Sequence, residues 1–123
     1  MSYNQLLEAT DTALSSLIAL NFARLTNEPN YDDRLHVEAD KYTPLMLQLL
    51  KSLQVKDTQL RDKRAADIKQ IYEREYHHYI MVLETFDLQP AKRAAYQYLQ
   101  WQCAAKIYGL LNIITHQPCV ISV

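Results

Sequence analysis

Two pairs of acidic and histidine residues have the types and spacing that could bind a metal ion. Asp33-x-x-His36 and Glu75-x-x-His78 each place a carboxylate and an imidazole three residues apart, which puts them on one face of a helix. The same motif recurs in di-iron helical bundles. In an antiparallel hairpin that turns near Lys56, both pairs lie about twenty residues from the turn and so at the same height. One hypothesis is therefore a metal- or small-ligand-binding bundle centred on Glu75 and His78.

The expected directions of these side chains argue against the metal site. At about 100° per residue, Asp33 and His36 point away from the apolar stripe of their helix, whereas Glu75 lies near the centre of its own stripe. The di-iron pattern also needs a glutamate from each of two further helices, but Glu8 projects toward solvent and the last predicted helix has no acid. We therefore predict no bound metal and no other cofactor.

Glu75 is unusual because burying an ionised carboxylate is costly unless it is paired or hydrogen-bonded. Two interpretations remain open: a satisfied polar cluster in the core, or a functional pocket. The candidate partners lie within one helical turn or carry a positive charge elsewhere in the chain: Tyr72, His78, Tyr79, Arg24, Arg64 and Lys106.

The usual signatures of catalysis are missing. Cys103 has no histidine close to it in sequence, Ser15 and Ser16 lie within a predicted helix, and there is no Gly-x-Ser-x-Gly elbow. The single glycine, Gly109, cannot build a phosphate-binding loop. We predict that the protein is not an enzyme.

A cluster of basic residues between positions 51 and 74 raises the question of nucleic-acid binding. Acids interleave with these bases at i, i+4 spacings, which is typical of a salt-bridged exposed helix and not of a phosphate track. Nucleic-acid binding is therefore a third hypothesis that the charge pattern disfavours. The basic residues are Lys51, Lys56, Arg61, Lys63, Arg64, Lys69 and Arg74.

The whole chain has nine tyrosines and one tryptophan, and six of these tyrosines and the tryptophan lie in its second half. Tyrosine and tryptophan are favoured at protein interfaces because they bury a large area and keep a polar tip. Tyrosines that fill a bundle core with their hydroxyls at its rim are the alternative. We predict a partner-binding surface made by Tyr76, Tyr98, Trp101 and Tyr108, because these side chains fall outside the main apolar stripes.

Four helices must position these groups. One glycine in 123 residues disfavours a sheet with tight hairpins. Apolar residues at helical spacing predict helices over residues 3–25, 31–53, 59–86 and 90–115, with Asn30 as the N-cap of the second. Thr43-Pro44 predicts that this second helix is kinked or split. Pro29, Pro90 and Pro118 mark the other boundaries.

Composition indicates a globular protein. With 49% hydrophobic and 22% charged residues, 123 residues suit a single helical domain over residues 1–123. No stretch reaches the ~18 apolar residues of a membrane helix, the N-terminus does not resemble a secretory signal, and Cys103 and Cys119 lack metal-binding spacing. We expect a cytoplasmic protein that does not enter membranes, with free thiols. The uncharged tail, residues 119–123, is expected to pack on the bundle or on a partner.

The sequence therefore predicts an all-α protein, an antiparallel four-helix bundle. The leading functional hypothesis is a non-enzymatic protein-binding module, of the inhibitor, chaperone or adaptor type, that acts on another protein or forms a homodimer. Its acidic N-terminal third, with seven acids against Arg24 and Arg34 in residues 1–40, would steer the approach of the partner.

Overall fold

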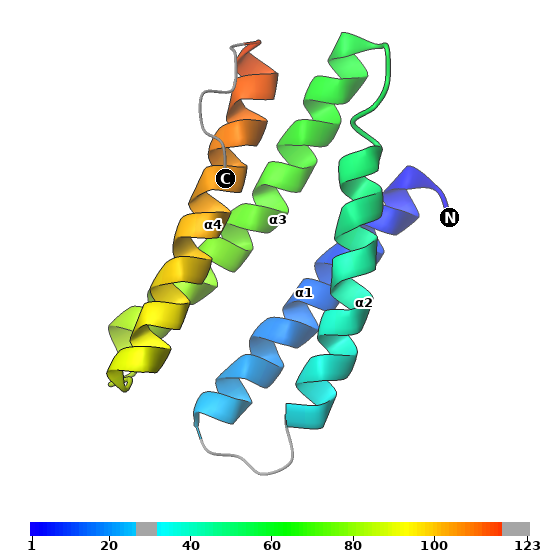
Figure 1. The fold of residues 1–123 in the computed structure, drawn as a ribbon. Coiled ribbons are helices and arrows are strands. Elements are labelled where there is room, and N and C mark those ends of the chain that lie inside the picture. The colour runs from blue at the N-terminus through cyan, green and yellow to red at the C-terminus, as the bar shows by residue number, and fades with distance from the viewer. Residues whose placement is uncertain (27–31, 117–123) are drawn as a thin grey trace. The chain divides into compact units, whose positions relative to one another are not determined.

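The protein is built from helices. The computed structural model describes residues 1–26 and 32–116, which form α1 (Tyr3–Leu25), α2 (Asp32–Lys51), α3 (Thr58–Thr85) and α4 (Pro90–Thr115) (Figure 1). The all-α prediction is confirmed, and these residues contain no strand. The predictions made for Pro29, Asn30, Pro118 and residues 119–123 lie outside the described residues.

The chain divides into two compact units, Met1–Gln54 and Val55–Val123. In the first unit α1 packs antiparallel against α2, and in the second α3 packs antiparallel against α4 (Figure 1). Each hairpin is described by itself. The prediction that residues 1–123 form a single domain stays a prediction.

Polar caps fix where two of the helices begin. At the start of α1, the Ser2 hydroxyl accepts a bond from the Gln5 amide at 3.2 Å while the Gln5 side chain accepts one from the Ser2 amide at 2.9 Å, which is a capping box. At the start of α3, the Asp57 carboxylate accepts from the amides of Gln59 and Leu60. Both caps satisfy amides that would otherwise lack an intrahelical acceptor.

The residues at the two ends of α4 also meet local requirements of the helix backbone. Pro90 occupies the first turn, where a missing amide proton does no harm. His116 ends the helix in the left-handed conformation, with φ of 59°, a position that glycine usually takes. Its Nε2 lies 3.0 Å from an Asp62 carboxylate oxygen, so this residue also ties the end of α4 to the first turns of α3.

Pro44 does not divide α2. The helix is continuous over Asp32–Lys51 with Pro44 inside it, so the predicted split at Thr43-Pro44 is wrong, and a kink is not confirmed. A proline here removes the bond to the Asp40 carbonyl. Because Thr43 and Pro44 are both exposed, water can solvate that carbonyl and the helix continues.

Each unit contributes buried apolar side chains. Helix α1 buries Leu6, Leu14 and Leu20, and α2 buries Met46 and Leu49. The second unit buries residues from both of its helices: Ala65, Ile68, Ile71, Tyr72, Val82, Tyr96, Cys103 and Leu110.

No helix in the described ranges is long and apolar enough to cross a membrane.

Replacing Pro44 with alanine should stabilise the protein. Alanine restores the missing helical bond, and proline is roughly 3 kcal/mol less favourable than alanine in a helix interior, although the freer unfolded chain offsets part of this gain. We expect the free energy of unfolding, measured by urea titration with circular dichroism, to rise by about 1–3 kcal/mol. Thr43→Ala, one residue away, should change it by only about 0.5 kcal/mol. A less stable Pro44→Ala variant would contradict this account.

Candidate functional site

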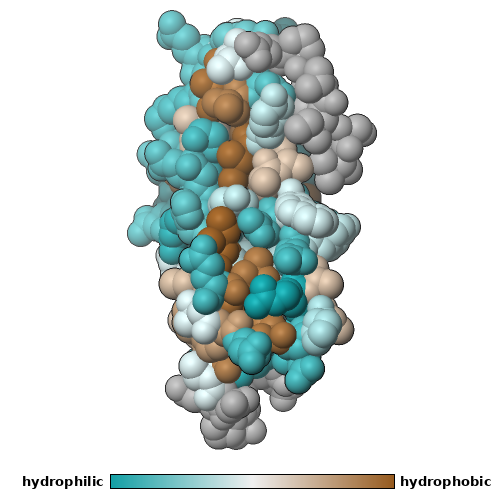
Figure 2. Space-filling model, turned by 90° about the vertical axis from the view of Figure 1, so that its left-hand side faces the viewer, coloured by the Kyte–Doolittle hydropathy of each residue, from teal (hydrophilic) through white to brown (hydrophobic). Residues whose placement is uncertain are grey.

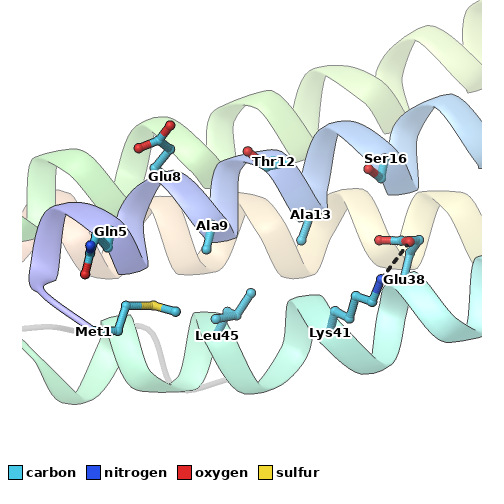
Figure 3. Close-up of a pocket in the computed structure, with 10 residues that line it drawn as sticks. All are labelled: Met1, Gln5, Glu8, Ala9, Thr12, Ala13, Ser16, Glu38, Lys41 and Leu45. Carbon is cyan, nitrogen blue, oxygen red and sulfur yellow. Dashed lines mark hydrogen bonds and ion pairs between the residues drawn. The ribbon is translucent and has the colours of Figure 1, made fainter.

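A groove runs between α1 and α2 of the first unit (Figure 3). Small side chains line it on α1, including Ala9, Ala13 and Ser16, and the Lys41 ammonium lies 3.3 Å from Glu38 on α2. The groove follows from the small size of these side chains. Its charged groups are already paired or open to water, so it brings together no nucleophile, base and polarising donor.

A polar cluster centred on Glu75 lies in the second unit, between α3 and α4. Its carboxylate Oε2 accepts two bonds, one from the Tyr79 hydroxyl at 2.9 Å and one from the Cys103 thiol at 3.2 Å. Tyr79 is one turn away on α3, whereas Cys103 comes from α4, and the ring of Tyr79 lies 6.2 Å from that of Tyr96. The structure therefore supports the interpretation of Glu75 as a half-buried member of a hydrogen-bonded polar cluster between the two helices.

Burial sets the protonation states of the groups around Glu75. It raises the pKa of Cys103 above its ordinary value of 9.0 and the pKa of Tyr79 above 10.0, and the Glu75 carboxylate adds to both shifts. The pKa of Tyr72 is raised for the same two reasons. Burial also lowers the pKa of His78 below 6.5, against the opposing effect of Glu75. At neutral pH the thiol and hydroxyls therefore hold their protons, and His78 is uncharged.

This arrangement suits structure better than catalysis. A nucleophilic cysteine needs a lowered pKa, and the pKa of Cys103 is shifted in the opposite direction.

Sequence reasoning identified Tyr79 as a neighbour of Glu75 but missed Cys103, because the bond joins residues 28 positions apart. The one available signal was that Cys103 lies on the apolar stripe of α4. Lys106, another partner considered for Glu75, has its ammonium over the Tyr72 ring, 5.3 Å from the centroid.

The residues of the hypothetical metal site lie in both units. His36 is exposed on α2, the side chain of Asp33 lies outside what the structure describes, and Glu75 and His78 are on α3. Within the described ranges, no three histidine, cysteine, aspartate or glutamate side chains gather as metal ligands would. The paired metal motif remains an untested alternative hypothesis.

Three of the four predicted partner-binding aromatics lie on the surface of α4. Trp101 is 66% exposed, Tyr98 59% and Tyr108 44%. Tyr76 differs, because it is half-buried on α3 with its ring edge-on to His77 at 5.9 Å. The exposed aromatic surface is therefore mainly a feature of α4.

The exposed face of α4 follows a seven-residue pattern. We call it the α4 seam; it begins at Ala94, recurs at alternating steps of three and four, and every member is exposed and uncharged. Figure 2 views the molecule from the side on which α4 lies in Figure 1, where hydrophobic residues, in brown, are exposed among hydrophilic ones, in teal. Such spacing is that of a helix face that packs on another helix. The seam comprises Ala94, Gln97, Trp101, Ala104, Tyr108, Leu111 and Thr115.

Comparison of the chain with protein-family models, with curated proteins and with solved structures finds no match. The functional argument therefore depends on these side chains and their geometry.

Stability should fall in acid because of His78. Its lowered pKa means that between the folded and unfolded values the unfolded chain binds more protons, so the free energy of unfolding falls as pH drops below about 6.5. It should also fall above about 9, where Cys103, Tyr72 and Tyr79 lose their protons more readily in the unfolded chain. Urea unfolding at a series of pH values from 5 to 10 measures the decrease in the free energy of unfolding on both the acidic and the alkaline side. His78→Gln should reduce the decrease in the free energy of unfolding on the acidic side, whereas His77→Gln, at an exposed neighbouring position, should not.

Removing the Glu75 carboxylate should destabilise the second unit. In Glu75→Ala the Tyr79 hydroxyl and Cys103 thiol lose their acceptor, and an unsatisfied buried donor costs roughly 1–3 kcal/mol. We expect urea unfolding to show a loss of about 2 kcal/mol. Glu73→Ala is the matched control, because the partly exposed Lys69–Glu73 pair, at 2.8 Å, should contribute less than about 1 kcal/mol. Equal losses of unfolding free energy in the two variants would show that the Glu75 cluster stabilises the protein no more than the Lys69–Glu73 ion pair does.

Proposed function

We propose that this protein is a non-enzymatic binding module that recognises another protein through the α4 seam and the adjoining Tyr98. The observation that carries the proposal is the exposure of Trp101, Tyr98 and Tyr108 on one uncharged helix face. Large aromatic side chains dominate the energy of many interfaces. A single helix that presents three of them to water has more apolar area than a helix packed only on α3 would need.

The spacing of the seam supports this proposal over scattered surface hydrophobicity. Isolated exposed apolar residues are common on any protein. Here Trp101, Ala104, Tyr108 and Leu111 recur with coiled-coil spacing on the side of α4 away from the buried Tyr96, Cys103 and Leu110. An inhibitor, chaperone or adaptor that acts in the cytoplasm would use such a surface to hold its target.

The other hypotheses receive less support. Glu75 already accepts two bonds inside the second unit, which favours a structural role for it over ligand binding. Among the bases of α3, Lys63 pairs with Asp67 at 2.9 Å and Lys69 with Glu73 at 2.8 Å. Bases neutralised in this way release few counterions from nucleic acid.

Truncating the two largest seam side chains should abolish binding. In the Trp101→Ala, Tyr108→Ala double variant we expect loss of the protein that copurifies with the full chain from its native host, because truncating a hot-spot aromatic typically costs at least ~2 kcal/mol. Since both side chains are exposed, circular dichroism and thermal unfolding should remain close to wild type.

The matched control removes exposed hydrophobic side chains from α3 instead. Leu60→Ala with Met81→Ala, at positions 37% and 43% exposed, should leave the copurified protein in place. A photo-crosslinking residue at position 104 should join the same protein to the seam. A folded double variant that retains this protein, or crosslinks only to a second copy of the chain, would contradict the proposal.

A further inference from the structure

We draw no further inference here: the strongest candidate, the α4 seam with its exposed Trp101 and Tyr108, belongs to the surface already proposed to bind a partner, and nothing in the structure shows what covers it.

Discussion

The hydrogen bond from Cys103 to the Glu75 carboxylate constrains the rotation of α4 about its own axis. Because the Cys103 thiol donates across the helix pair at 3.2 Å, Cys103 must face α3. At about 100° per residue, Trp101 and Tyr108 then lie on the side of α4 turned away from Cys103, where both are exposed. A different rotation would bury the aromatic rings and move the apolar inner face into water. The polar cluster and the exposed aromatic surface are thus two consequences of one helix orientation.

A polar contact specifies this orientation better than apolar packing alone could. Apolar side chains surround much of α4, so several rotations would bury a similar area. Only the observed rotation brings the Cys103 thiol to the half-buried Glu75 carboxylate; the Tyr79 bond lies within α3 and is kept in any rotation, so the other rotations leave Glu75 with one donor fewer. A single buried polar residue sets register in this way in coiled coils.

Much of the fold could be predicted from the sequence because local signals determine it. The capping box at Ser2, the Asp57 cap and Pro90 lie within one turn of the helix ends that they mark. Pro44 misled the prediction because exposure decides whether a helix tolerates proline, and exposure depends on tertiary packing. The Cys103 bond was missed for the same reason, since nothing in the sequence near Glu75 points to α4.

The presence of an exposed aromatic surface could be predicted from the sequence, but not which aromatic side chains form it. Trp101 and Tyr108 stood out because they fell beyond the apolar stripe, but Tyr76 satisfied the same criterion and is half-buried. What separates them is the arrangement of large and small residues on α4, where Ala104 and Ala105 lie between the exposed side chains of Trp101 and Tyr108. Tyrosine and tryptophan suit such a position, since their polar tips keep the unbound face hydrated while their rings remain available for burial.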